Sequence, residues 1–399
     1  MKSTAKKTDR TEKPVFRVTD YGVVPDLPTI QTKALQAVLD LCRPAGGTVI
    51  LPRGTYHTGG LWLWSGTTLV LEPGTLLKGS ANREDYPVFP VPSTVRMRCD
   101  MQLITDYYPN GPWETYRRAI LSAYGERDIS ILGSADSIID GSNCYDPDGE
   151  EGYRGPHAIF LSDCKNVRLE GYTVQHSGNF LHEANSCEDL IMDRVTCIGG
   201  SDGIHMHFTK HATIRDCVFR TGDDCVAGIN VEDLVVKHCF LNTSCNLFRL
   251  GGRKIRIEDC IAIGPGEWPH RMTVVKGPGK ELPKEQGRHN TLFALTYFAS
   301  TAYPYEPSDI TFRNCLFENF YAFLEYRADN PPLQAGTHLG RLNLENVRIR
   351  NMETPFYIEG NANEPLKIRL RSVTLWDGDE LSEKPLFVPG PNVEIREVP

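Results

Sequence analysis

Short runs of alternating apolar and polar residues recur along most of the chain, and each run ends in a cysteine, valine or tyrosine. The ends of these runs fall at Tyr172, Val195, Cys217, Cys239, Cys260, Cys315 and Val347. The first five positions are separated by 23, 22, 22 and 21 residues. A period near 22 residues is too short for repeats of helix pairs and is typical of a strand-based solenoid. The pattern therefore predicts an all-β fold, a right-handed parallel β-helix with about three short strands in each turn.

The period also separates this fold from a β-sandwich. Strands of a sandwich recur about every 8–12 residues, but nothing makes a sandwich repeat one local pattern at the longer interval. In a β-helix, Cys217, Cys239 and Cys260 would occupy equivalent places in successive turns, stacked roughly 5 Å apart in the core. None of the 12 cysteines forms a CxxC pair, which favours buried, reduced thiols over a zinc ribbon or a redox motif.

The remaining segments predict the domain organisation. Residues 1–15 are basic and polar and predict a disordered tail, and residues 16–399 predict a single β-helix domain. Apolar residues at helical spacing in 29–42 predict a helix that caps the N-terminal end of the solenoid. Irregular segments at about 86–118 and 264–307 are rich in proline, glycine or aromatic residues, and predict inserts that wall a groove.

Charge and hydropathy exclude several partners. The formal net charge is −8, which argues against a nucleic acid or an anionic membrane as partner. No run approaches the ~20 apolar residues of a membrane span. The N-terminus has no apolar stretch of the secretory type, which together with the unpaired cysteines predicts a cytoplasmic protein, or a secreted one if a native signal was removed.

Aspartates at two corners of the predicted solenoid carry the candidate chemistry. The sequence GSDGI surrounds Asp202 and TGDDC surrounds Asp223 and Asp224. Asp202 and Asp223 are 21 residues apart, one period, so they should lie side by side on adjacent turns. The Asp-Gly pair in the first segment and the Gly-Asp pair in the second are each common in ordinary turns. Three carboxylates held together repel one another, so at least one should have a raised pKa and hold the proton that glycoside cleavage requires.

Most of the chain resembles a known family, and the resemblance begins in the N-terminal segments. The segments DYGVVPD at 20–26, GGTVILPRGTY at 46–56 and LVLEPGTLLKGS at 69–80 are similar to the pectin-lyase-like β-helix proteins and, more narrowly, to glycoside hydrolase family 28, the polygalacturonases. The similarity extends from about 18 to 350 and includes the three aspartates. It implies an inverting hydrolase in which Asp223 is the general acid, while Asp202 and Asp224 activate the water.

Two motifs depart from the family pattern. Ser244-Cys245-Asn246 occupies the place of a glycine-flanked histidine, and His270-Arg271-Met272-Thr273 the place of an Arg-Ile-Lys motif. The resemblance implies that Cys245 and Arg271 face the substrate there, although the family's lysine is absent and galacturonate specificity is therefore in doubt.

Further candidates come from the residues themselves. Arg249 follows Cys245 closely enough to reach the groove, and His205 and His207 should share one face of their strand. Sugar contact is favoured for this pair over metal binding, because no third ligand is evident. The sequence thus predicts neither a metal nor a cofactor.

The predicted function is an inverting, exo-acting glycoside hydrolase on pectin-type oligosaccharides of the plant cell wall. The expected partner of the protein is an oligosaccharide or polysaccharide substrate. Cleavage from one end of the substrate is expected because the two inserts would close the groove. Two alternatives remain open. One is a polysaccharide lyase or epimerase on the same fold, and the other is a β-helix that binds carbohydrate without cleaving it.

Overall fold

The computed structural model describes residues 13–88, 117–145, 155–274, 284–299, 307–330, 334 and 336–399. Most of the predicted tail at 1–15 and of the insert at 86–118 lies outside these residues, as does part of the insert at 264–307. Those segments, and the division of the chain into a tail and one domain, therefore stay predictions.

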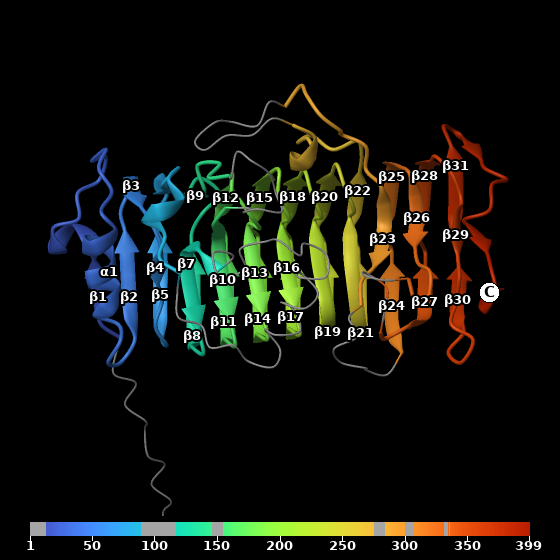
Figure 1. The fold of residues 1–399 in the computed structure, drawn as a ribbon, viewed down its shortest axis with the longest axis horizontal. Coiled ribbons are helices and arrows are strands. Elements are labelled where there is room, and N and C mark those ends of the chain that lie inside the picture. The colour runs from blue at the N-terminus through green and yellow to red at the C-terminus, as the bar shows by residue number, and fades with distance from the viewer. Residues whose placement is uncertain are drawn as a thin grey trace, which may run out of the picture.

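The strands stack into a right-handed parallel β-helix, as predicted (Figure 1). Its walls are three ladders of strands, and β19 (Val226–Lys237) and β21 (Phe248–Glu258) run unbroken through two of them. Besides these two, the first wall contains β4 (Leu61–Trp62), β7 (Ala119–Tyr124), β10 (His157–Ser162), β13 (His182–Asn185), β16 (Ile204–His207), β23 (Phe293–Tyr297) and β26 (Ala322–Glu325).

The second wall is built from strands whose inward residues form the apolar core. It contains β1 (Val15–Arg17), β2 (Gly47–Leu51), β5 (Thr67–Leu71), β8 (Arg127–Leu132), β11 (Lys165–Glu170), β14 (Glu188–Asp193), β17 (Lys210–Arg215), β24 (Ser308–Arg313), β27 (Leu339–Glu345), β30 (Leu366–Arg371) and β34 (Val393–Glu397). The register of this wall repeats from turn to turn, with Leu190 opposite Ala212, then Leu234, Ile255 and Ile310. This register is what the sequence period of about 22 residues specifies.

The third wall forms a sheet of its own. It contains β3 (Gly54–Thr58), β6 (Thr75–Gly79), β9 (Ile138–Asp140), β12 (Thr173–Gln175), β15 (Thr196–Gly199), β18 (Val218–Thr221), β20 (Phe240–Thr243), β22 (Ile261–Ile263), β25 (Leu316–Phe320), β28 (Arg348–Met352), β31 (Thr374–Asp377) and β32 (Glu380–Leu381). Among the described strands, only β31 and β32 pair antiparallel. A separate pair joins β29 (Phe356–Ile358) to β33 (Phe387–Pro389).

The predicted cysteine stack is present in the core. The thiols of Cys217, Cys239, Cys260 and Cys315 each donate to a backbone carbonyl of the turn before, with Sγ···O distances of 3.7, 3.9, 3.7 and 3.6 Å. Identical contacts in four turns place these side chains one above another. All 11 cysteines in the described part of the chain are buried and unbridged, which confirms the prediction of reduced thiols for them.

Helix α1 (Thr32–Asp40) covers the N-terminal end of the solenoid, as predicted, and is drawn in blue at the left of Figure 1. It buries Leu35, Val38 and Leu39 against the first turns. The amide side chain of Gln36 accepts from the Trp62 N–H at 2.7 Å and donates to the Trp62 carbonyl at 3.2 Å. The edge of β4 is therefore capped by the hydrogen bonds that another strand would have supplied. None of the described helices is long and apolar enough to cross a membrane.

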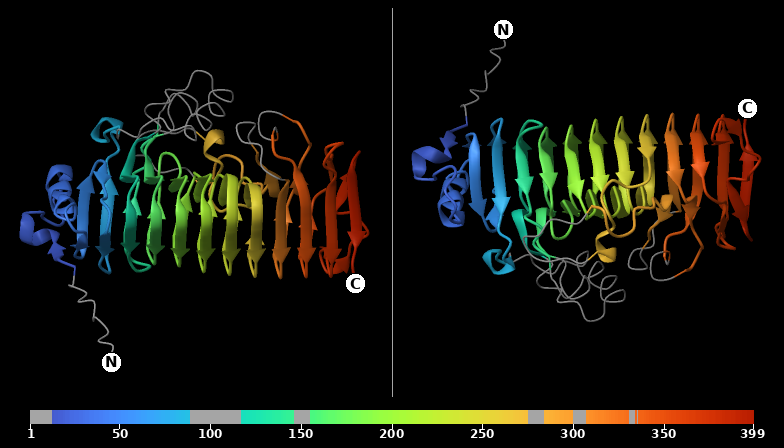
Figure 2. Two further views of the ribbon diagram at one scale, coloured as in Figure 1. Left: turned by 90° about the horizontal axis from the view of Figure 1, so that it is seen from below. Right: turned by 90° about the horizontal axis from the view of Figure 1, so that it is seen from above.

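Residues 264–274 fold back onto the solenoid beside the ends of β18 and β20 and include the short helix η4 (Arg271–Thr273) (Figures 1 and 2). Further along the predicted insert, residues 293–297 form β23 of the first wall, so that part of the range is strand and not loop. The hydroxyl of Ser244 donates to the Trp268 carbonyl, and Gly266 N–H donates to the His289 carbonyl at 2.7 Å. A Cβ atom on Gly222 would lie 2.0 Å from the Pro269 carbonyl oxygen. Only glycine at this position lets the insert pack so closely beside Asp223.

Candidate active site

The site lies at one corner of the solenoid, where the third wall passes into the first. Asp202 lies between β15 and β16, Asp223 and Asp224 lie between β18 and β19, and Cys245 lies between β20 and β21. Backbone hydrogen bonds align these corners, with Gly203 N–H donating to the Asp224 carbonyl at 2.9 Å. The parallel stacking brings residues one period apart into contact, as the sequence predicts.

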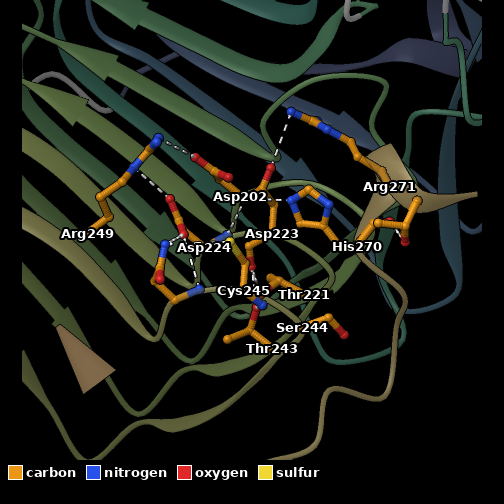
Figure 3. Close-up of polar contacts among 12 residues, drawn as sticks. Asp202, Thr221, Asp223, Asp224, Thr243, Ser244, Cys245, Arg249, His270 and Arg271 are labelled. Carbon is orange, nitrogen blue, oxygen red and sulfur yellow. Dashed lines mark hydrogen bonds and ion pairs between the residues drawn. The ribbon is translucent and has the colours of Figure 1, made fainter. Parts of the chain in front are cut away.

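The three aspartates form one cluster (Figure 3). One carboxylate oxygen from each of Asp202, Asp223 and Asp224 lies within 4.8 Å of the other two. Asp202 and Asp224 are fully buried, whereas the side chain of Asp223 keeps 15% of its surface exposed. Asp223 is therefore the member of the cluster that solvent or a ligand can reach.

Arg249 faces the cluster from β21, which supports its predicted place in the groove. Its Nε lies 2.7 Å from Oδ2 of Asp224, and its Nη2 lies 3.8 Å from Oδ2 of Asp202. The guanidinium also lies 4.7 Å from the ring centre of Phe298, in the geometry of a cation–π contact. Burial would lower the pKa of Arg249, but the facing carboxylates outweigh burial and raise it. Arg249 is thus a fixed cation beside Asp224.

The insert supplies a second pair of basic groups, drawn at the right of Figure 3. Nε2 of His270 lies 3.7 Å from Oδ1 of Asp223, and Nη2 of Arg271 lies 3.6 Å from Oδ2 of the same carboxylate. In the sequence these residues occupy the place of the family's Arg-Ile-Lys motif. The strand that lies beside Arg249 in the next turn is β23, on which Thr296 is opposite Arg249. Arg271 therefore reaches the site from a loop, and His270, not named as a site residue from sequence, comes with it.

His205 and His207 share one face of β16, as predicted, with ring centres 4.6 Å apart. His205 stacks on Phe180 at 4.3 Å, and its Nδ1 lies 2.8 Å from Oδ2 of Asp202. Both imidazoles are buried. The His205 ring thus contacts a carboxylate of the cluster directly, while the predicted sugar contacts of both rings remain predictions.

Cys245 occupies the corner one turn beyond Asp223 and Asp224 and is buried. Burial, followed by the charges of Asp224 and Asp223, raises the pKa of its thiol well above the usual range. A neutral thiol cannot carry the charge that an imidazole would bring to this place. Sγ of Cys245, one oxygen of Asp223 and one nitrogen of His270 lie within 4.8 Å of one another. Ligands of these three kinds are the ones a zinc-type ion prefers, and the sequence pattern predicts no metal at this place.

The surroundings shift the pKa values of the three aspartates in different directions. Burial, together with the charges of Asp223 and Asp224, raises the pKa of Asp202 well above its usual value. Burial also raises the pKa of Asp224, against the opposing charge of Arg249. For Asp223 the imidazole of His270 and the guanidinium of Arg271 outweigh burial and hold the pKa well below its usual value. The expected raised pKa is present, on Asp202 and Asp224 and not on the predicted general acid.

The segment that carries this site is similar to a known protein family. The sequence profile of glycosyl hydrolases family 28 matches residues 116–249, the segment that carries all three aspartates and ends at Arg249. An exo-poly-α-D-galacturonosidase of Dickeya chrysanthemi is 25% identical over 249 residues, covering 53% of this chain and 41% of the relative. A probable polygalacturonase of Vitis vinifera is 26% identical over 61% of this chain and 54% of the relative. The matches thus span about half the length of these curated relatives.

Solved structures agree at the level of the fold. A family 28 exopolygalacturonase of Yersinia enterocolitica superposes with a TM-score of 0.63 over 97% of this chain and 78% of its own, at 18% sequence identity. At that identity the likeness shows the fold alone. The profile match and the curated relatives support the prediction of a glycosidase, and they confirm that this chain resembles glycosyl hydrolases family 28, with the resemblance centred on the segment that holds the aspartate cluster.

Proposed function

We propose that this protein is a glycoside hydrolase that cleaves pectin-type oligosaccharides or polysaccharides at the cluster of Asp202, Asp223 and Asp224. The single observation behind the proposal is the meeting of three carboxyl groups within 4.8 Å at one corner of the groove. Glycoside cleavage needs one carboxyl group that gives a proton to the leaving oxygen and another that activates water. The curated relatives named above are described as galacturonosidases and polygalacturonases, which supports pectin as the substrate class.

In the proposed mechanism Asp223 protonates the leaving oxygen. It is the partly exposed member of the cluster, so it is the carboxyl group that a bound glycosidic oxygen can approach. Asp224 and Asp202 are more deeply buried and would hold the attacking water on the interior side of Asp223. Asp224 suits the role of base, because Arg249 and the amide of Asn246 both stabilise its charged form, at 2.7 and 2.8 Å.

The low pKa of Asp223 puts a condition on this mechanism, because a donor must first hold a proton. Arg271 is one cause of the low pKa, and its 3.6 Å distance from Asp223 is too long for a hydrogen bond. Arg271 is buried, and a sugar carboxylate that reaches it would be a bidentate partner for its guanidinium. An acidic sugar that draws Arg271 away would raise the pKa of Asp223 and allow it to take up a proton. The proposal therefore favours a uronic acid as the sugar bound beside Asp223.

We further propose that the enzyme acts from the chain end. The insert packs on Gly222 through Pro269 and places His270 and Arg271 against Asp223, so it covers one side of the cluster. A substrate whose chain ends at the insert needs no binding surface beyond it.

A time course with oligogalacturonides of increasing length tests both parts of the proposal. Release of one terminal sugar at a time, with no early fall in polymer viscosity, is the expected result. Mixed internal fragments would refute the exo action, and the absence of any cleavage of uronides would refute the substrate class. Asp223→Asn, which keeps the shape of the side chain, serves as the inactive control.

A further inference from the structure

A line of hydrogen bonds leads from the cluster to a fourth carboxyl group. Nδ2 of Asn246 donates to Oδ1 of Asp224 at 2.8 Å. Oγ1 of Thr296 lies 3.1 Å from Oδ1 of Asn246 and also 3.1 Å from Oε2 of Glu325. Asn246 and Thr296 are buried, and Glu325 is partly buried. Asp224 and Glu325 are thus connected across three turns of the solenoid by two intervening side chains.

The chemistry of Thr296 fixes the direction of these bonds. A threonine hydroxyl has a single proton, so it can donate to only one of its two partners. The carbonyl oxygen of Asn246 can only accept, because the amide nitrogen is already directed at Asp224. If Glu325 were ionised, both partners of Thr296 would be acceptors and one of them would receive no proton from Thr296. A proton on Glu325 removes the conflict.

We propose that Glu325 is a positioning residue that holds a proton and, through Thr296 and Asn246, keeps an N–H donor pointed at Asp224. With Glu325 neutral, its O–H donates to Thr296, Thr296 donates to Asn246, and Asn246 donates to ionised Asp224. Every group in the line is then satisfied, which matters because a buried polar group without a partner is costly. The inference rests on the proposed function in one respect, since it assigns the purpose of the line to keeping Asp224 ready to activate water.

The alternative arrangement of the same line is also satisfied but less favourable. If Asp224 carried the proton, the Asn246 amide would turn over, its nitrogen would donate to Thr296, and Thr296 would donate to ionised Glu325. That arrangement loses the favourable charge contact between Asp224 and Arg249 at 2.7 Å. It would also weaken the backbone N–H of Asn246 as a donor to Asp224 at 3.3 Å. The hydrogen bonds therefore couple the protonation state of Asp224 to that of Glu325. Arg249 favours the arrangement in which Asp224 is ionised and Glu325 is protonated.

The surroundings of Glu325 agree with a neutral side chain. Burial raises the pKa of Glu325, and the negative charge of Asp224 adds to that effect. A hydrogen bond with Thr296 in which Glu325 is the ionised acceptor acts in the opposite direction, as do the charges of Arg327 and Arg249, without reversing the shift. The raised pKa of the glutamate is thus consistent with the hydrogen-bond argument, which stands on geometry.

Three variants test the role of the line by kinetics. Glu325→Gln keeps a donor for Thr296 and should retain activity close to wild type. Glu325→Ala and Thr296→Val remove the line and should each lower kcat about 10-fold, the effect of losing roughly one hydrogen bond. KM should change little. The acidic limb of the pH profile should move to higher pH, because Asp224 loses a donor that stabilises its charged form.

A matched control exists on the opposite wall. Thr311 on β24 accepts a hydrogen bond from Asn343 at 3.1 Å, so Thr311→Val removes a similar threonine–asparagine bond far from the aspartates. This variant should leave the kinetics and the pH profile unchanged. Circular dichroism of all variants identifies any that fail to fold, and Glu325→Gln provides the rescue that a purely structural role would not require.

Infrared spectroscopy tests the proton independently of activity. In protein labelled with ¹³C-glutamate, a shifted carboxylic acid C=O band should be present near neutral pH and lost in Glu325→Gln. Absence of this band, or equal damage from Glu325→Gln and Glu325→Ala, would overturn the inference. If no glycoside is cleaved, the proposed function fails, and the infrared band still decides whether Glu325 holds the proton.

Discussion

Nε2 of His270 lies 3.7 Å from Oδ1 of Asp223, although the two residues come from segments that the β-helix period does not relate. Asp223 belongs to a corner of the regular turns, and His270 belongs to the insert that folds back over them. Together with Arg271, the imidazole holds the pKa of Asp223 well below its usual value. The insert therefore acts on the chemistry of the cluster through these two side chains.

Replacing this imidazole should change the pH dependence of activity. In His270→Gln the pKa of Asp223 should rise, because a charge that stabilises its ionised form is lost. If protonated Asp223 is the proton donor, the alkaline limb of the kcat/KM profile should move to higher pH. His211→Gln is the matched control, since His211 forms a comparable exposed pair with Asp233 at 3.0 Å. Identical alkaline limbs in His270→Gln and wild type would show that this pair does not control the donor.

The roles of Asp223 and Asp202 can be separated by the choice of leaving group. Asp223→Asn should lower turnover of natural oligosaccharides by about 10² to 10⁴, the usual contribution of a general acid. An activated aryl glycoside needs little protonation, so the same variant should recover much of its activity on that substrate. Asp202→Asn should remain slow on both substrates, because water activation is still required. If Asp202→Asn recovered activity on the aryl glycoside and Asp223→Asn did not, Asp202 would be the proton donor and Asp223 would act on the water.

The sequence predicts the parts of this site that follow the period. Asp202 and Asp223 are one period apart, so stacking of parallel strands places them together whatever their side chains contact. His270 and the correct path of Arg271 escape prediction, because a loop outside the period can return to any turn. Thr296 escapes for a different reason. It occupies an ordinary strand position, and only the three-dimensional register brings Thr296 and Glu325 into line with Asn246 and Asp224.

The buried aspartate should also affect stability. The pKa of Asp202 is raised by burial, so in the folded state it keeps its proton to a higher pH than in the unfolded chain. Its contribution to stability is complete below the unfolded pKa of about 3.9 and is lost as pH rises toward the folded pKa. The side chain of Asp202→Asn cannot ionise, so the variant does not lose stability as pH rises. Its Tm should therefore be higher than that of wild type at neutral pH, and the difference in Tm should be smaller near pH 4. Equal Tm differences at both pH values would contradict the raised pKa.

Chelation separates hydrolysis from the alternative of a metal-dependent lyase. Arg249 and Arg271 already face Asp224 and Asp223, so the cluster has compensating charge without an added cation. Treatment with EDTA followed by buffer exchange should leave the rate unchanged within error. The products should also lack the ultraviolet absorbance of an unsaturated uronide. Loss of activity that calcium restores would favour a lyase, and recovery by zinc alone would indicate the set of Asp223, Cys245 and His270.

The stereochemistry of the first product tests the detailed mechanism. Carboxyl groups of inverting enzymes are generally about 6.5–9.5 Å apart and those of retaining enzymes about 5–5.5 Å, whereas the nearest oxygens here lie within 4.8 Å. Spacing alone would therefore favour retention. The hydrogen bonds favour inversion, because neither remaining aspartate is suited to attack the sugar. Asp224 is engaged by Arg249 and Asn246, and Asp202 is buried with a raised pKa. Proton NMR of the anomeric signal, recorded before mutarotation, should show the inverted anomer, and a retained anomer would make one aspartate a nucleophile.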